Sequence, residues 1–174
     1  MDDWFLGNYL PLDTLGRLLA AAVAGALLGW ERELQDKPAG LRTHMLVALG
    51  AAVFMVATLD YLDTKVDKDV ARYFDPLRVV AGVIGGIGFL GAGAIIQSAG
   101  NVHGMTTAAS IWIAAAIGIA AGLGMYGIAF ASVIIALVIL VAMRVVERDI
   151  VRRDPPEERP PKNPLLGPKD PGEK

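Results

Sequence analysis

The chain has 174 residues, of which 54% are hydrophobic, and its mean hydropathy of +0.48 is too high for an ordinary soluble domain of this size. The 65 residues from Val79 to Met143 contain no Asp, Glu, Lys or Arg, whereas one membrane-spanning helix needs about 20 apolar residues. The absence of cysteine excludes a disulfide scaffold, a thiolate zinc site and cysteine catalysis. Composition also excludes a soluble single-domain enzyme and a disordered protein, and predicts an all-α integral membrane protein.

Five membrane-spanning helices are predicted after a short extracytoplasmic segment, residues 1–11, whose aromatic side chains suit a membrane interface. The last helix is predicted to extend beyond Met143 as far as Arg153. The proline-rich residues 154–174 are predicted to be a disordered tail, because proline blocks helix propagation and little apolar area remains for a core. The predicted spans lie near residues 12–31, 43–61, 79–98, 106–121 and 125–143.

The basic residues beside the spans predict that the N-terminus lies outside and the C-terminus in the cytoplasm. In this orientation the cytoplasmic segments carry seven Lys or Arg residues, and the outer segments carry five. The basic cluster that begins at Arg144 supports the same orientation, as does the absence of basic residues before the first span.

The third span is rich in glycine. Gly86, Gly88 and Gly91 match G-x-G-x-x-G, but that pattern binds dinucleotides only between a strand and a helix, and here it lies in an uncharged apolar run. Small residues let membrane helices approach closely, so the third span is predicted to be the central helix. The alternative is a locally unwound helix whose carbonyl groups line an ion path. The predicted packing residues are Gly82, Gly85, Gly86, Gly88, Gly91 and Gly93.

Two pairs of small residues are predicted to pack against that central span. Gly25 and Gly29 form one pair in the first span, and Gly118 and Gly122 form the other in the fourth. Small-residue faces that are left over are compatible with a homodimer.

Polar side chains gather where the first span meets the second and where the third meets the fourth, at the same cytoplasmic depth. Glu31 and Arg42 are predicted to form an ion pair, because an unpaired charge at an apolar boundary is costly. His44 and His103 are either pH-sensitive groups or plain hydrogen-bonding residues. The predicted junction comprises Glu31, Arg32, Arg42, Thr43, His44, Gln97, Asn101, His103, Thr106 and Thr107.

Sequence motifs for chemistry are absent: there is no Ser-His-Asp set, metal-binding helix motif or phosphate loop. We therefore expect no enzyme activity, no cofactor and no nucleic-acid partner. A Mg²⁺ ion would need oxygen ligands, for which Glu33 and Asp36 are candidates. The alternative is that these carboxylates are simply solvated.

Three segments carry a resemblance to a known family. GWERELQDKPAGLRTHMLVALGAAVF (Gly29–Phe54), DPLRVVAGVIGGIGFLGAGAII (Asp75–Ile96) and GMTTAASIWIAAAIGIAAGLGMY (Gly104–Tyr126) resemble, in order and spacing, the signatures of the MgtC/SapB family of bacterial inner-membrane proteins. The positions that match the family's motifs are Glu31, Arg32, Lys37, Pro38, Gly40, Arg42, Thr43, His44, Asp75, Arg78, Gly104, Thr106 and Thr107.

The resemblance implies five transmembrane helices with a cytoplasmic C-terminus, a role in growth at low magnesium and, in pathogens, survival inside macrophages. Some members are described as inhibiting the membrane sector of ATP synthase, and others are linked to phosphate or acid stress. Virulence-associated members carry an additional ACT-like domain, where this sequence has a short proline-rich tail. His103 also stands where the family pattern leads us to expect Arg or Lys.

The sequence therefore predicts a small non-enzymatic membrane protein that supports magnesium or stress homeostasis by binding other membrane proteins. The competing prediction is a transporter or channel for Mg²⁺ or another ion, with the glycine-rich third span and the polar junction as its path. Intramembrane charges usually mark transport pathways, and the central parts of the second to fifth spans contain none.

Overall fold

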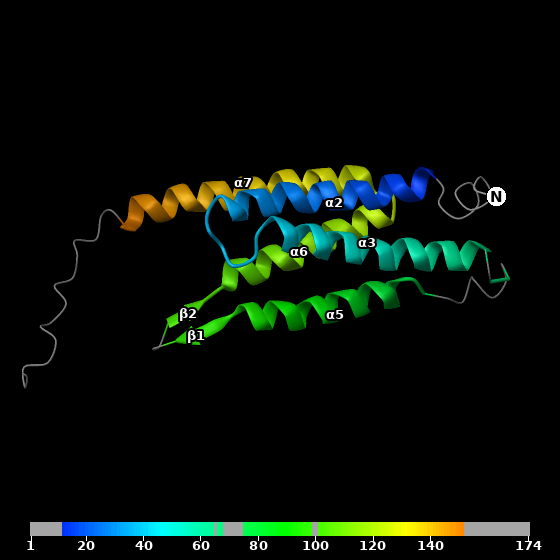
Figure 1. The fold of residues 1–174 in the computed structure, drawn as a ribbon, viewed down its shortest axis with the longest axis horizontal. Helices are drawn as coiled ribbons and strands as arrows, with labels where there is room; N and C mark the ends of the chain where they lie inside the picture. Colours follow the sequence, from blue (N-terminus) through cyan, green and yellow to red (C-terminus); the bar gives the residue numbers. More distant parts are fainter. Residues whose placement is uncertain (1–11, 65, 68–74, 99–100, 152–174) are drawn as a thin grey trace, which may run out of the picture. The chain divides into compact units, whose positions relative to one another are not determined.

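The computed structural model describes residues 12–64, 66–67, 75–98 and 101–151, so the N-terminal segment and the proline-rich tail lie outside the described residues. Five of its helices are long and apolar enough to cross a membrane, which confirms the predicted fold class. These helices are α2 (Leu12–Glu33), α3 (Leu41–Thr64), α5 (Leu77–Ala94), α6 (Met105–Gly122) and α7 (Tyr126–Val151) (Figure 1).

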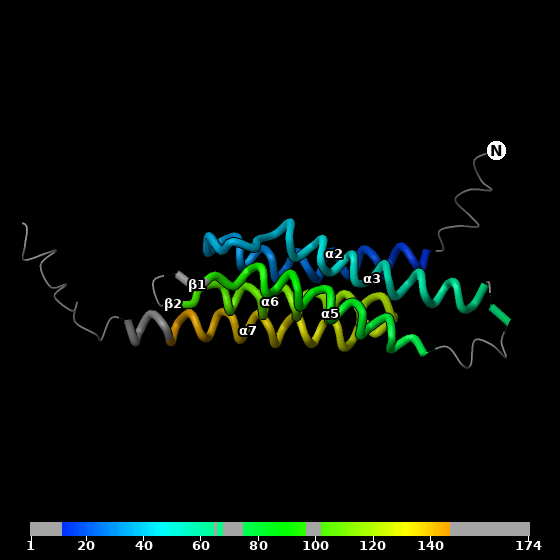
Figure 2. Tube along the Cα trace, turned by 90° about the horizontal axis from the view of Figure 1, so that it is seen from below, coloured from blue at the N-terminus to red at the C-terminus, as the bar shows by residue number. Residues whose placement is uncertain are grey.

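The chain divides into two compact units within α7. The first unit ends at Ile139 and contains α2, α3, α5, α6 and the first turns of α7, and the second begins at Leu140 with the remaining turns. The helical extension predicted beyond Met143 is confirmed as far as Val151, where the described residues end. Figure 2 shows α2, α3, α5 and α6 of the first unit running along a common direction.

The most buried helix is α6, and it contacts α2, α3 and α5. Ten of its 18 residues are buried, whereas Gly91 is the single buried residue of α5. The expectation that the glycine-rich helix is central is therefore wrong. Alanine, serine and glycine occur on every side of α6, so several neighbours can approach its backbone at once. The glycines of α5 other than Gly91 have no atom of another element within 4 Å of an added Cβ.

The small-residue pairs of α2 and α6 pack against α3 and not against α5. A Cβ added at Gly25 would lie 2.5 Å from the carbonyl oxygen of His44, and one added at Gly122 would lie 2.9 Å from that of Ala52. On α3 the facing residues are themselves small, since Ala48 and Ala52 are fully buried. Backbone-to-backbone contact therefore holds α2, α3 and α6 together, and α5 adds to this group through α6 and α3.

The third span is shorter than predicted, because α5 ends at Ala94 and not at Ser98. Ile95 takes an extended conformation, and a hairpin follows in which β1 (Ile96–Ser98) pairs antiparallel with β2 (Asn101–His103). Gly104 then turns the chain into α6 with a left-handed φ of +87°. Strand pairing satisfies the backbone groups of this segment without continuing the helix, at a place where an unpaired group would be costly.

Gly104→Ala is expected to destabilise the protein by about 2 kcal/mol or more. A left-handed φ costs an L-residue about 1–2 kcal/mol, and the added Cβ would also overlap the carbonyl oxygen of Ala94. Thermal unfolding of the purified protein in detergent measures the effect. Gly93→Ala is the matched control, because its Cβ meets nothing within 4 Å; equal unfolding temperatures for the two variants would contradict the prediction.

Candidate functional site

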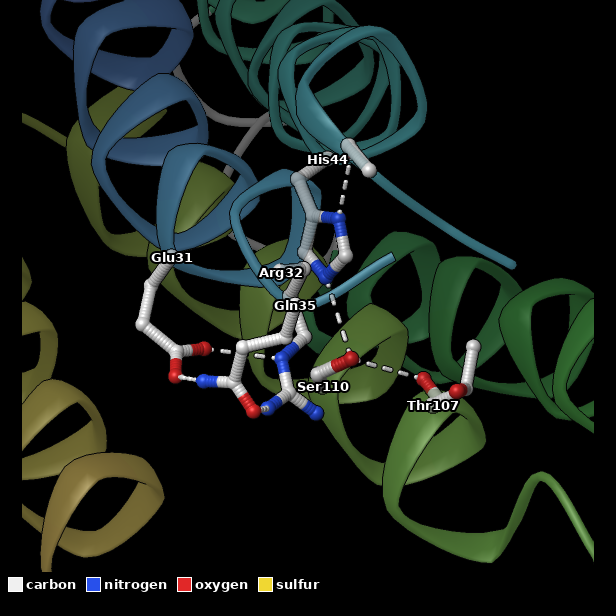
Figure 3. A network of polar contacts seen from close by, with 7 residues as sticks. Glu31, Arg32, Gln35, His44, Thr107 and Ser110 are labelled. Atoms are coloured by element: carbon white, nitrogen blue, oxygen red, sulfur yellow. Dashed lines mark hydrogen bonds and ion pairs between the residues drawn. The ribbon is translucent and has the colours of Figure 1, made fainter. Parts of the chain in front are cut away.

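The candidate site lies at the end of the first unit where α2 ends, α3 begins, α5 ends and α6 begins, which we call the junction end. Several side chains that the sequence analysis placed at one depth are found there together (Figure 3). They form two hydrogen-bonded groups, one around Arg32 and one around His44.

The first group surrounds the guanidinium of Arg32, which is only 3% exposed. Its Nε donates to Oε2 of Glu31 at 2.8 Å, and its Nη2 donates to Oε1 of Gln35 at 3.4 Å. The Gln35 amide in turn donates to Oε1 of Glu31, so the three side chains close a ring of contacts (Figure 3). Nη1 is buried and has no hydrogen-bond partner among the described residues. The charge of Arg32 is thus balanced by one carboxylate, which makes Glu31 the residue on which its burial depends.

The second group joins α3 to α6 through the fully buried side chain of His44. The carbonyl of Gly40 can only accept, so Nδ1 donates to it at 2.8 Å, while Nε2 lies 3.0 Å from Oγ of Ser110. The Ser110 hydroxyl donates to the carbonyl of Thr107 at 2.8 Å. A serine has one proton, so all three bonds coexist only when Nε2 also donates. When the ring is neutral, the Ser110 hydroxyl can donate to only one of two acceptors, Nε2 of His44 or the carbonyl of Thr107.

The connection between α2 and α3 is held by a carboxylate that the sequence analysis named as a candidate Mg²⁺ ligand. Oε2 of Glu33 accepts a hydrogen bond from the backbone N–H of Leu41 at 2.9 Å, so Glu33 caps α3. Asp36 is exposed and takes a left-handed φ of +52° in the turn. In the part of the chain that the structure describes, no three His, Cys, Asp or Glu residues are placed to hold a metal ion.

The predicted ion pair between Glu31 and Arg42 is wrong, because Glu31 pairs with the residue beside it. Arg42 is exposed and forms no ion pair within the described residues. The seven-residue connection between the two helices, residues 34–40, does bring the start of α3 beside the last turns of α2, where Gly29 faces Leu41. However, the side chain of Arg42 on the first turn of α3 points to the surface, while Arg32 is buried on α2.

The described side chains of the remaining predicted residues do not join either group, and Asp75 and Arg78 lie at the opposite end of α5 from the junction end. Thr107 is buried, but no side chain caps α6, where Gly104 occupies the N-cap position. Gln97 and Asn101 lie on β1 and β2, and their side chains lie outside the described part. Oδ1 of Asp75 accepts from the N–H of Leu77 at 2.9 Å, at the start of α5. Exposed or half-buried positions are taken by Lys37, Pro38, Thr43, Arg78, His103 and Thr106.

Sequence reasoning missed Gln35 and Ser110. Gln35 lies four residues after Glu31, the spacing at which helical side chains meet, but it stands in a stretch that reads as a charged loop. Ser110 is the one polar residue inside the apolar part of α6, three positions after Thr107. A buried hydroxyl needs a partner, so its position on a membrane helix was a usable signal.

The pattern of the MgtC family matches residues 18–149, which include α3, α5, α6, most of α2 and α7, and the junction end. The chain belongs to the MgtC family. It is 44% identical to the putative magnesium transporter YhiD of Escherichia coli over 110 residues. This matched stretch covers 63% of this chain and 51% of YhiD. Over 118 residues the chain is 46% identical to protein MgtC of Salmonella typhimurium, covering 68% and 47%.

A third relative is protein SapB of Bacillus subtilis, which is 38% identical over 130 residues, or 74% of this chain and 56% of SapB. The chain thus matches about half the length of each of these relatives. No solved structure matches it. Family membership and the five apolar helices together make this chain a multi-pass membrane protein embedded in a lipid bilayer.

Proposed function

We propose that this MgtC family protein supports adaptation to low magnesium or a related stress by binding and modulating another membrane protein, without catalysing a reaction. One relative is named as a putative magnesium transporter and others as MgtC, and these names support a link to magnesium. We further propose a bacterial inner-membrane location with a cytoplasmic junction end, from the distribution of basic residues described above.

The observation that carries this proposal is the position of the polar side chains. In the described helices the charged residues lie near helix ends, and the buried Arg32 of the junction end is bonded to Glu31 of its own chain. Ion pathways usually carry ionisable groups in the middle of the membrane. A protein whose central helix surfaces are apolar is better suited to contact lipid and other helices.

The outward face of α5 is the surface on which we expect a partner helix. Ala81, Gly85, Gly88 and Ala92 recur at the spacing of one helical face, and all four are exposed. A Cβ at Gly85 or Gly88 would meet nothing within 4 Å, although each glycine costs a helix about 0.5–1 kcal/mol relative to alanine. Close approach of a second membrane helix would offset that cost.

The alternative function is transport of Mg²⁺ or another ion, which the printed name of YhiD favours. It would require a path lined by backbone carbonyl groups, since the middle of the described helices carries no charged side chain.

Two measurements test the proposal. In a strain lacking the gene, Gly85→Leu and Gly88→Leu are expected to restore growth at low magnesium less well than the wild type, with unchanged protein levels and unfolding temperature.

Purified protein in liposomes is expected to give no Mg²⁺ flux above empty liposomes. A Mg²⁺ flux that depends on the protein would contradict the binding function and favour transport. Full growth of both variants would show that the outward face of α5 does not bind the partner. The membrane sector of ATP synthase, which the family resemblance implies, is the first partner to test by cross-linking.

A further inference from the structure

An apolar groove of about 700 Å³ runs between α3 and α5. Its lining includes Gly50 on the α3 wall and Gly86 on the α5 wall, and neither has another element within 4 Å of an added Cβ. Leu46 and Phe54 mark its extent on α3, and Val79 and Leu90 mark it on α5. The groove therefore exists because glycine stands where a larger side chain would fill it.

The length of the groove indicates what occupies it. From Leu46 to Phe54 the rise of an α-helix gives about 12 Å, and from Val79 to Leu90 it gives about 16 Å. One leaflet of a bilayer is about 15 Å deep, half of the hydrocarbon thickness, whereas a spanning partner helix would need a contact of about 30 Å. The groove is long enough for one acyl chain and too short for a spanning helix.

A positively charged side chain, Arg42, lies just beyond the end of the groove that is nearer the junction end. Arg42 precedes Leu46 by four residues, so it lies on the same side of α3 and about 6 Å nearer the helix start. It is exposed and forms no ion pair in the described part of the chain. The N-terminus of α3 lies at the same level, but its Leu41 N–H already donates to the carboxylate of Glu33, so Arg42 and not the helix terminus would hold an anion there. At the other end, Arg78 precedes the lining residue Val79 by one position, about 1.5 Å along the helix, so it lies at the level of the lining and not beyond it. The carboxylate of Asp75, which accepts from the N–H of Leu77, adds a negative charge to that end.

We propose that this groove binds one acyl chain of an anionic phospholipid, with the lipid phosphate at Arg42. The spacing between the cation and the apolar lining corresponds to that between a headgroup and its chains, and arginine suits phosphate because it offers several donors. This surface differs from the outward face of α5, because Gly86 lines the groove and Gly85 does not.

Native mass spectrometry of the full chain, titrated in detergent with dioleoyl phosphatidylglycerol, tests the proposal. Gly86→Leu and Gly50→Leu place side chains in the groove from opposite walls, and each is expected to weaken binding about tenfold or more, equivalent to about 1.4 kcal/mol. Gly85→Leu is the matched control, since its Cβ also meets nothing. Arg42→Gln is expected to weaken binding about fivefold, equivalent to about 1 kcal/mol for one interfacial charge. Arg78→Gln should leave it unchanged.

Three outcomes would overturn the proposal. The first is unchanged phosphatidylglycerol binding in both groove variants, and the second is equal effects of Arg42→Gln and Arg78→Gln. The third is a protein dimer that the groove variants dissociate, which would make the groove an interface between copies. Dioleoyl phosphatidylcholine should bind more weakly than phosphatidylglycerol, and glycerol phosphate without acyl chains should not compete. The growth assay tests the proposed partner face through Gly85 and Gly88, whereas the lipid titration tests the groove through Gly50 and Gly86. Failure of one proposal can therefore be told from failure of the other.

Discussion

Gly118→Ala is expected to destabilise the helix bundle by about 3 kcal/mol, at the upper end of what overpacking a core usually costs. The added Cβ would overlap the carbonyl oxygen of Ala48, and the carbonyl carbon and Cα of that residue also lie within 2.8 Å. These are backbone atoms in the middle of α3, so no rotamer change relieves the overlap. The two helices would have to separate, and contacts along the whole α3–α6 interface would weaken.

Unfolding of the purified protein in mixed micelles, followed by circular dichroism, measures this loss. Gly82→Ala is the control, because it makes the same chemical change at a helical position with nothing within 4 Å. It should leave stability unchanged or raise it by about 0.5–1 kcal/mol through helix propensity. If Gly118→Ala proves as stable as Gly82→Ala, then α3 and α6 do not meet as described.

Glu31→Gln is expected to cost about 3 kcal/mol, the lower end of the range for removing one partner of a buried ion pair. The change leaves the Arg32 guanidinium buried, with Nη1 already unpaired among the described residues. Glutamine keeps the shape and some hydrogen bonding, so the loss reports the missing charge. Asp13→Asn is the comparison, since the Asp13–Arg17 pair is exposed on the carboxylate side and should contribute less than about 1 kcal/mol.

Double-mutant cycles separate the observed pair from the one expected from sequence. Glu31→Gln combined with Arg32→Gln should show coupling well above about 0.5 kcal/mol, the scatter for independent sites, and Glu31→Gln combined with Arg42→Gln should stay within it. Strong coupling to Arg42 would mean that the exposed arginine folds back onto Glu31 in the membrane.

Hydropathy alone located all five helices, because apolar runs bounded by charges leave few alternatives in a membrane. The helix ends were less predictable. Sequence reasoning continued the third span to Ser98 because no charge interrupts it. The end of α5 depends instead on Gly104, whose left-handed turn and contact with Ala94 allow the hairpin to form. Such a contact between residues ten positions apart has no signature in a hydropathy pattern.

Glycine content also did not reveal which helix is central. Gly86 of α5 and Gly118 of α6 look alike in the sequence, yet one faces open space and the other touches the backbone of Ala48. At the junction end, the sequence analysis paired Glu31 with Arg42; neighbouring residues on a helix do not ordinarily face each other, and Arg32 gave no sign of being the partner. The long Arg32 side chain near the end of α2 reaches back to Glu31, and it is buried in a helix that contacts both α3 and α6, which the sequence does not show.

The unequal lengths of the helices have a consequence for the surrounding bilayer. At 1.5 Å per residue, the 18 residues of α5 and of α6 span about 27 Å, and the 24 residues of α3 span about 36 Å. The uncharged part of α3, residues 43–59, spans only about 26 Å, so the turns that follow it, which carry Asp60 and Asp63, extend past a hydrocarbon layer of about 30 Å into the interface. The apolar lengths of all three helices are slightly below that thickness, so the lipid beside the bundle must thin, at a cost that rises with acyl-chain length. A change in lipid composition can therefore act on the stability of this protein without any ligand.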